Sequence, residues 1–377
     1  MKHTITVWDD LGVTLQLSTF AEGKKPEHHA MLHVEPCGEL FEGQYARLSE
    51  AERRLADLLP EARPIVKRYF LSDAANQAPL IPSPTGPCAV SLIQQPPLDG
   101  SKVAAWIYLA EGLDVQDEGG VTLCRSNGYE HLWQMGLTAP EGDSYRQTAS
   151  VLQTYESTLR KHAATIEANC LRTWFYVRDV DTQYGGMVQA RRENFLQEGL
   201  TPATHYIAST GIQGIPASPS AIIQLGGYAL KGTEAGQVRY VRALTHLNPT
   251  IEYGVTFERG TVVDFGDRSH CLISGTASID NKGRVLHTGD VVKQTLRMWE
   301  NVAALLHEGG FTPDDVAQIV VYLRDVADYA TVRSMFASRF PGVPAVFTLA
   351  PVCRPEWLIE MECTAIRPLS GNAFRDF

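Results

Sequence analysis

A seven-residue motif occurs twice in this chain, and this repeat constrains the fold more than any other feature. GDSYRQT covers residues 142–148, and GDVVKQT covers residues 289–295. Each copy runs into a segment with apolar residues at helical spacing, so we expect the Asp to cap a helix. A matching strand follows each helix, TWFYVRDV from Thr173 and IVVYLRDV from Ile319. The two signals keep nearly the same separation, which indicates a duplicated structural unit.

The segments around each copy predict the rest of the unit. Each strand leads into an amphipathic helix, over residues 188–197 in the first copy and 330–340 in the second. Runs of strand composition surround them, among them SAIIQLGGYAL and WLIEMECTAI. This order predicts an α+β fold with two tandem domains, each a mixed sheet covered by two helices on one face.

We place the domain boundary in the polar segment KGTEAGQ, where few contacts are expected to cross. The first domain then spans residues 1–232 and the second spans 233–377. The first hundred residues show less regular patterning and include the Pro- and Ser-rich stretch LIPSPTGP. We therefore expect them to form an irregular extension of the first domain.

Composition narrows the functional classes. The formal net charge of −10 argues against nucleic-acid binding, which needs concentrated positive charge. The sequence contains no run of eighteen apolar residues, so we expect no membrane span. The N-terminal MKHTITVWDD lacks the apolar segment of a signal peptide. The seven cysteines form no CxxC pair and fit a reduced cytoplasm. Without glycine-rich phosphate motifs or metal-ligand spacing, we expect no cofactor and no metal.

The stretch VCRPEWLIEMEC contains the best candidate for an acid catalyst. Read as a strand, it places Leu358, Glu360 and Glu362 on one face. A carboxyl group buried beside an apolar residue and a second carboxylate has a raised pKa and can act as a general acid near neutral pH. The alternative is that both glutamates belong to the solvated face of an ordinary strand.

Residues from about 253 to 366 resemble the RidA (YjgF) domain. The segments that carry the resemblance are LISGTASID, the helix from Asp290, VVYLRDVADYATVRSMFASRF and PAVFTLAPVCRPEWLIEMECTAI. RidA proteins proper hold the substrate carboxylate with an arginine directly after Pro-Ala, and this chain has Val346 there. That departure argues against RidA-type deamination of imines or enamines, which we keep as an alternative function.

The chain from about Val103 onwards resembles the chorismatase family more closely. Five motifs occur in order: LRTWFYV at Leu171, LQEGLTPATHYIASTGIQG at Leu196, YGVTFERGT at Tyr253, LISGTASI at Leu272 and CRPEWLIEMEC at Cys353. The family fuses a degenerate RidA-like domain to a catalytic one and cleaves chorismate with release of pyruvate. The resemblance implies a chorismate lyase or hydrolase that needs no cofactor and serves secondary metabolite biosynthesis in the cytoplasm.

The resemblance also assigns roles to individual residues. Glu360 matches the glutamate that protonates the enolpyruvyl group. Cys353 and Gly260 match two positions that are alanine in the hydrolytic members and Cys with Gly in the members that make 3-hydroxybenzoate. We therefore expect 3-hydroxybenzoate and pyruvate as products, with 4-hydroxybenzoate left open. Cys353 is expected to assist ring aromatisation as a base or proton relay, and Gly260 to leave room for the ring.

The two carboxylates of chorismate require cations. Arg259 matches a family arginine and is the first choice, Arg354 is the second, and Tyr184 with Arg191 could reach the cleft from the first domain. The family's Tyr-Arg-Asp-Phe run is replaced by YGGMV, which we place in a shortened loop. This departure leaves open a non-catalytic small-molecule-binding protein. The chain is expected to be a monomer or a homo-oligomer, with a trimer as one form because RidA domains commonly form trimers.

Overall fold

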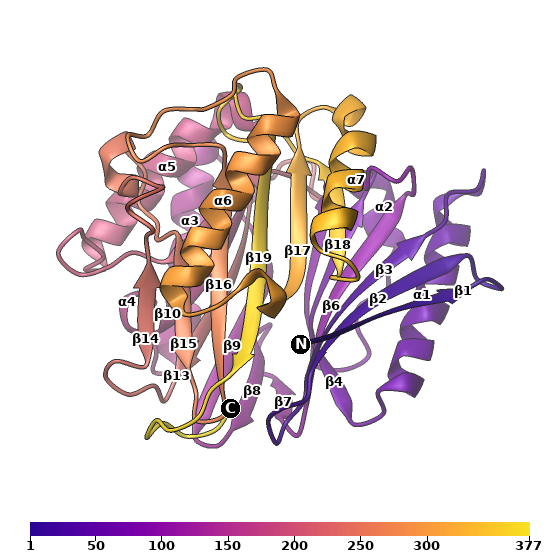
Figure 1. Ribbon diagram of the computed structural model, residues 1–377, viewed down its shortest axis with the longest axis horizontal. Helices are drawn as coiled ribbons and strands as arrows, with labels where there is room; N and C mark the ends of the chain where they lie inside the picture. The colour runs from indigo at the N-terminus through magenta and orange to yellow at the C-terminus, as the bar shows by residue number, and fades with distance from the viewer.

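The computed structural model describes residues 1–377, except for the side chain of Tyr253, with which the motif YGVTFERGT begins. The chain forms three mixed sheets, each with helices on its outer face (Figure 1). We call the corresponding parts unit 1 (residues 2–111), unit 2 (114–231) and unit 3 (238–368). The α+β class is confirmed, and a third unit precedes the two that the repeat predicts.

Unit 1 corrects the expectation for the first hundred residues. Its elements are β1 (Lys2–Trp8), β2 (Val13–Phe20), β3 (Glu27–Val34), α1 (Phe41–Leu58), β4 (Ala62–Leu71), α2 (Ala74–Gln77), η1 (Ala78–Leu80), β5 (Ala89–Gln94) and β6 (Val103–Glu111). The strand order is β1-β2-β3-β6-β4-β5, and β12 (Ile215–Pro216) from later in the chain joins the β5 edge. These residues therefore form a complete sheet with its own long helix rather than an irregular extension.

Unit 2 contains the first copy of the repeat. Its elements are β7 (Asp114–Asp117), β8 (Thr122–Ser126), β9 (Tyr129–Thr138), α3 (Ser144–Lys161), α4 (Ile166–Asn169), β10 (Cys170–Val177), α5 (Val180–Gln197), β11 (Ala208–Gln213) and β13 (Ile223–Lys231). The strand order β11-β10-β13-β9-β8-β7 is that of unit 1 read from the other edge. YGGMV lies inside α5 and not in a shortened loop, because the helix continues through both glycines.

Unit 3 contains the second copy. Its elements are β14 (Val238–Val241), η2 (Thr250–Tyr253), β15 (Gly260–Asp264), β16 (Arg268–Ala277), α6 (Val291–Gly309), η3 (Pro313–Asp315), β17 (Val316–Leu323), η4 (Val326–Asp328), α7 (Tyr329–Arg339), β18 (Ala345–Leu349) and β19 (Ile359–Pro368). Its order is β14-β15-β16-β19-β17-β18. The first two strands are joined by residues 242–259, whereas residues 9–12 and 118–121 suffice in the other units.

The repeated motif performs the same structural task in each copy. Asp143 and Asp290 accept the backbone N–H groups of Arg146 and Lys293 as helix N-caps, as predicted. A buried glutamine in the first turn of each long helix then accepts the backbone N–H just before the last strand of its unit. The three bonds run from Lys102 to Gln44 (2.7 Å), from Ile222 to Gln147 (2.7 Å) and from Leu358 to Gln294 (2.9 Å). Unit 1 therefore keeps the glutamine and lacks the capping aspartate.

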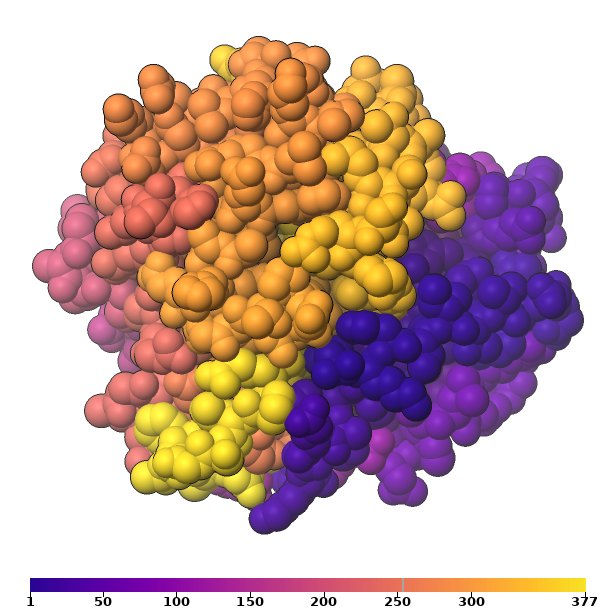
Figure 2. Space-filling model, viewed as in Figure 1, coloured from indigo at the N-terminus to yellow at the C-terminus, as the bar shows by residue number. Residues whose placement is uncertain are grey.

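The three units pack around a shared core. Trp106 of unit 1, Trp174 of unit 2 and Val320 of unit 3 belong to one buried apolar cluster, and the long helices lie outside the sheets (Figure 1). At the surface, the indigo residues of unit 1 lie beside the orange and yellow residues of unit 3 (Figure 2). None of the described helices combines the length and apolar character that crossing a bilayer requires.

Candidate active site

A cavity of about 280 Å³ lies between units 2 and 3. Unit 2 contributes residues of α5 and β11, and unit 3 contributes residues of β16, β19, the 242–259 segment and the connection between β18 and β19. Six of the seven predicted site residues line it: Glu360, Cys353, Arg259, Arg354, Tyr184 and Arg191. The volume approaches that of ordinary small-molecule pockets.

Glu360 is the second residue of strand β19, and its buried side chain lines the cavity. Burial, and next the negative charge of Glu362, raise the pKa of Glu360 to about 8, although Arg259 and Arg172 act in the opposite direction. Glu360 therefore carries a proton at neutral pH, which a general acid requires. Both glutamates are buried, so the solvated-face alternative does not describe this strand.

Glu362 is held as a carboxylate by four hydrogen-bond donors. Its Oε1 accepts from Arg68 Nη1 (3.1 Å) and Trp174 Nε1 (3.0 Å), and its Oε2 accepts from Arg172 Nη2 (2.8 Å) and Thr210 Oγ1 (2.6 Å). Burial alone would favour the neutral acid, but the guanidinium groups of Arg172 and Arg68 hold the pKa of Glu362 below its usual value. Because two donors bind each carboxylate oxygen, protonation of Glu362 would break at least one of these hydrogen bonds.

Gly275 of β16 makes room for the Glu360 carboxyl group. A Cβ at this position would overlap Oε1 of Glu360 and lie 2.9 Å from its Cδ. Only a residue without a side chain can therefore lie beneath the acid. The N–H of Gly275 donates to Thr210 Oγ1 (2.9 Å).

Three arginines from separate elements surround the cavity. Arg191 lies on α5 and donates to Ser209 Oγ (3.4 Å), Arg259 precedes β15 and donates to the Asn248 carbonyl oxygen (3.2 Å), and Arg354 donates to the Gly283 carbonyl oxygen (3.3 Å). Arg191 and Arg259 are buried. Three guanidinium groups beside a neutral acid make the cavity suited to an anion with more than one carboxylate.

Cys353 and Tyr184 meet across the interface between the units. The Tyr184 hydroxyl group lies beside the Cys353 thiol, and Gly211 leaves space for the tyrosine ring, since a Cβ there would lie 3.0 Å from Tyr184 Cε2. Desolvation, and next the charge of Glu360, raise the pKa of Cys353 to about 12. The sulfur is therefore a neutral thiol near pH 7, which fits a proton relay better than a thiolate base.

Gly260 is not in the cavity wall. A Cβ at this position would lie 2.8 Å from Val241 Cγ2 and 3.0 Å from Ile273 Cδ1, which belong to the neighbouring strands. The space beside Gly260 is thus filled by the packed sheet, and the expectation that it makes room for a ring is corrected.

The sequence analysis missed Phe257 and Trp357, which also line the cavity. Both could have been suspected, because Phe257 lies two residues before Arg259 and Trp357 lies three residues after Arg354 in the same motifs.

The equivalent strand positions in the other units have no acid. Glu360 pairs with Tyr322 of β17, and the same tyrosine of the first repeat copy, Tyr176 of β10, pairs with Gln224. Gln224 is therefore the residue of unit 2 that is equivalent to Glu360. The Gln224 amide donates to Ser91 Oγ of unit 1 (3.0 Å) and is buried. The last strand of unit 1, VAAWIYLAE, carries no acidic residue before Glu111. Among the described units, the acid is therefore found at one interface.

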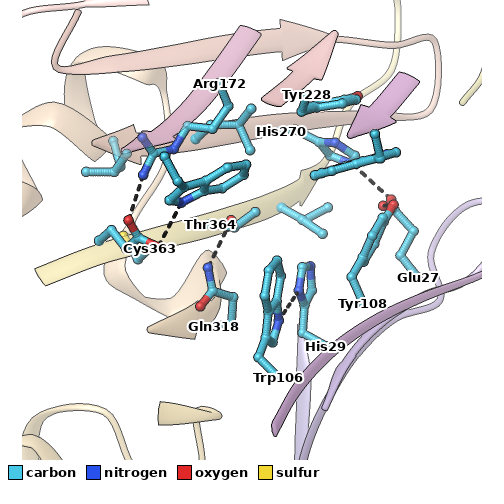
Figure 3. A pocket seen from close by; sticks show the side chains of 16 residues that line it. Glu27, His29, Trp106, Tyr108, Arg172, Tyr228, His270, Gln318, Cys363 and Thr364 are labelled. Atoms are coloured by element: carbon cyan, nitrogen blue, oxygen red, sulfur yellow. Dashed lines mark hydrogen bonds and ion pairs between the residues drawn. The ribbon is translucent and has the colours of Figure 1, made fainter. Parts of the chain in front are cut away.

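A second, smaller cavity lies at the centre of the molecule, where the three sheets meet (Figure 3). Its volume of about 30 Å³ admits water and no organic substrate. Glu27 beside it accepts hydrogen bonds from Arg268 (2.6 Å), His270 (2.9 Å) and Tyr108 (2.5 Å). These contacts bind units 1 and 3 together, so we assign this cavity a structural role.

The comparisons with known proteins agree with this architecture. Residues 263–367 match the family model described as Endoribonuclease L-PSP. A RutC family protein of Pyrococcus abyssi (strain GE5 / Orsay) is 32% identical over 98 residues, which are 26% of this chain and 77% of that protein. A crystal structure of a chorismatase shares the fold with a TM-score of 0.63 and 20% identity, over 80% of this chain and 92% of that chain. The YjgF gene product of E. coli is 24% identical over 34% of this chain and 98% of its own, with a TM-score of 0.28.

Fold and site together define a chain of three α+β units with an arginine-lined cavity at one interface, and unit 3 is a RidA/YjgF (L-PSP) domain. Through this unit the chain belongs to the RutC family.

Proposed function

We propose that this protein is a chorismatase that cleaves chorismate to 3-hydroxybenzoate and pyruvate. The observation that carries the proposal is the cavity in which the buried carboxyl group of Glu360 lies together with Arg191, Arg259 and Arg354. The raised pKa of Glu360 agrees with a role as proton donor. Chorismate has two carboxylates and an acid-labile enol ether, so it needs cations and a proton donor in one place. The fold likeness to a chorismatase over most of both chains supports the same choice.

In the proposed reaction, Glu360 gives its proton to the methylene carbon of the enolpyruvyl group, which becomes the methyl group of pyruvate. The oxocarbenium ion that forms makes the ether easier to cleave. The bond between ring carbon C3 and the ether oxygen then breaks, pyruvate leaves with that oxygen, and the C4 hydroxyl oxygen bonds to C3 and loses its bond to C4. Loss of the C3 proton makes the ring aromatic with its hydroxyl group at C3. Of the C4 hydroxyl proton and the C3 proton, one stays on the product hydroxyl group and the other returns to Glu360 through the neutral Cys353 thiol. The two products contain every atom of chorismate, so this branch consumes no water, whereas a dihydrodiol branch would add water.

The test is the release of pyruvate from purified protein and chorismate, coupled to lactate dehydrogenase. Wild type should release pyruvate, and Glu360→Gln should lower kcat by at least about 100-fold, the usual contribution of a general acid. Glu356→Gln is the matched control, because Glu356 is an exposed residue of the same segment outside the cavity wall. Wild type without pyruvate release, or Glu360→Gln with full release, would overturn the proposal.

The role of Cys353 makes a separate prediction about the products. In Cys353→Ala the proton relay is lost while Glu360 remains, so pyruvate release should continue and the product should shift from 3-hydroxybenzoate toward the dihydrodiol. Chromatography of the aromatic products measures the ratio, and Cys88→Ala is the control for loss of a thiol elsewhere. An unchanged ratio in Cys353→Ala would refute the relay. The fraction of 4-hydroxybenzoate, if any, comes from the same chromatogram.

The alternative of a RidA-type deaminase receives less support from the geometry. Val346, at the position of the RidA arginine, is buried in β18 opposite Val320 and does not line the cavity. A deaminase would hydrolyse 2-aminoacrylate, which the proposed enzyme should leave unchanged. A non-catalytic binding protein would instead retain chorismate without releasing pyruvate.

A further inference from the structure

Thr210 connects the catalytic cavity with the buried ion network behind it. Its Oγ1 lies 2.6 Å from Arg172 Nη2, 2.6 Å from Glu362 Oε2 and 2.9 Å from the backbone nitrogen of Gly275. Arg172 and Gly275 can only donate to this oxygen, and a hydroxyl group has one proton and two acceptor sites. The Thr210 proton must therefore point at Glu362, and the hydroxyl group has all of its hydrogen bonds made.

Two of these three bonds, those of Thr210 with Glu362 and with Gly275, cross from one unit to another. Thr210 and Arg172 belong to unit 2, on β11 and β10, whereas Glu362 and Gly275 belong to β19 and β16 of unit 3. Gly275 is the residue beneath the Glu360 carboxyl group. One side chain of unit 2 thus fixes both the backbone under the acid and the carboxylate next to it.

We propose that Thr210 is a positioning residue for the reaction proposed above: its hydroxyl group holds Gly275 beneath the Glu360 carboxyl group and donates one of the four hydrogen bonds that fix the Glu362 side chain. Thr210 does not reach the cavity itself, because it is fully buried behind the wall. Its effect on catalysis is therefore exerted through Gly275 and Glu362.

The test compares two substitutions of Thr210 that remove different atoms of its side chain. Thr210→Val keeps the shape and removes the oxygen, whereas Thr210→Ser keeps the oxygen and removes the methyl group. Without the oxygen, the Gly275 N–H loses its acceptor, so the backbone beneath the Glu360 carboxyl group is held less firmly and water can reach this group. Hydration favours the carboxylate and reduces the desolvation that raises the pKa of Glu360. Thr210→Val should thus lower the pKa of Glu360 by about half a pH unit or more, and Thr210→Ser should stay within about 0.2 of wild type.

The pKa of Glu360 can be measured without substrate, from the side-chain carboxyl carbon signal in a ¹³C NMR titration assigned with Glu360→Gln. Other ionisable groups face Glu360 from every element that packs against it, and they are unchanged in both variants. These groups are Glu362 on β19, Arg172 on β10, Tyr184 and Arg191 on α5, Arg259 before β15, and Cys353 and Arg354 before β19.

The kinetic arm uses chorismate and the pyruvate assay. Thr210→Val should lower kcat about five-fold or more with KM nearly unchanged, because a misplaced acid affects the chemical step. Thr210→Ser should recover most of kcat. A Thr210→Val variant with the wild-type pKa of Glu360 overturns the inference, as does a Thr210→Ser variant that loses as much as Thr210→Val. If wild type releases no pyruvate, the proposed function fails, and the NMR arm still decides whether Thr210 controls Glu360.

Discussion

At the scale of single residues, two glutamates that look equivalent in the sequence have opposite roles. Glu362 meets four donors and stays charged, whereas Glu360 faces a cavity and stays protonated. Different environments push the pKa values of two neighbouring carboxyl groups apart in this way. The sequence predicted Glu360 as the acid, but not the arginines Arg68 and Arg172, because they approach from other units.

The raised pKa of Glu360 predicts a pH-dependent effect of Glu360→Gln on stability. The folded-state pKa of about 8 exceeds the ordinary value of about 4.3, so the folded state binds the proton more tightly than the unfolded chain does. Wild type should lose stability, relative to the variant, as the pH rises from about 5 to 8, by up to about 1.4 kcal/mol per pH unit. Thermal melts of both proteins over this range measure the difference in Tm. A difference that is independent of pH would contradict the assigned pKa.

At the scale of elements, helix α5 depends on a pair of glycines with unequal surroundings. A Cβ at Gly186 would overlap the Ser144 hydroxyl and lie 2.9 Å from the backbone nitrogen of Tyr145, whereas a Cβ at Gly185 would meet nothing within 4 Å. Gly186 thus permits α5 to pack closely against the start of α3. This contact places Tyr184 and Arg191 of α5 at the cavity.

The two glycines therefore predict opposite effects on stability. Gly186→Ala should destabilise the protein by about 1–3 kcal/mol through overpacking. Gly185→Ala should stabilise it by up to about 1 kcal/mol, because alanine favours the helix. Urea unfolding measures both free energies. Equal effects of the two substitutions would show that α5 does not pack against α3 as described.

The elements of units 2 and 3 were predictable because each copy retains the Gly-Asp cap and the Gln-Thr pair. Unit 1 was missed for a physical reason: α1 begins after Leu40 without a side-chain cap, so no Gly-Asp signal marks it. Only Gln44 preserves the shared contact with the last strand. A single glutamine is too weak a pattern to indicate a repeat.

The role of Gly260 was predicted wrongly, because the sequence does not show which neighbouring side chains fill the space beside a strand glycine.

At the scale of the whole molecule, three units of one topology make three interfaces, and one of them holds the acid in a cavity. Neither unit 2 nor unit 3 completes this site alone, since Tyr184 and Arg191 come from one and Glu360 from the other. The buried carboxylates Glu27 and Glu362 tie all three units together at the centre. This arrangement explains why the sequence could suggest the cavity residues but not the contacts between units that position them.

The central claim is that Glu360 delivers a proton to the methylene carbon of chorismate in this cavity. The most direct measurement is turnover in D₂O, with pyruvate trapped at once as lactate by lactate dehydrogenase and examined by NMR. Carboxyl and thiol protons exchange with solvent, so Glu360 and Cys353 carry deuterium between turnovers in D₂O. We therefore predict lactate with a singly deuterated methyl group from wild type, together with 3-hydroxybenzoate, and no labelled lactate above background from Glu360→Gln. Lactate without methyl deuterium from wild type, or equal labelled lactate from Glu360→Gln, would contradict the claim.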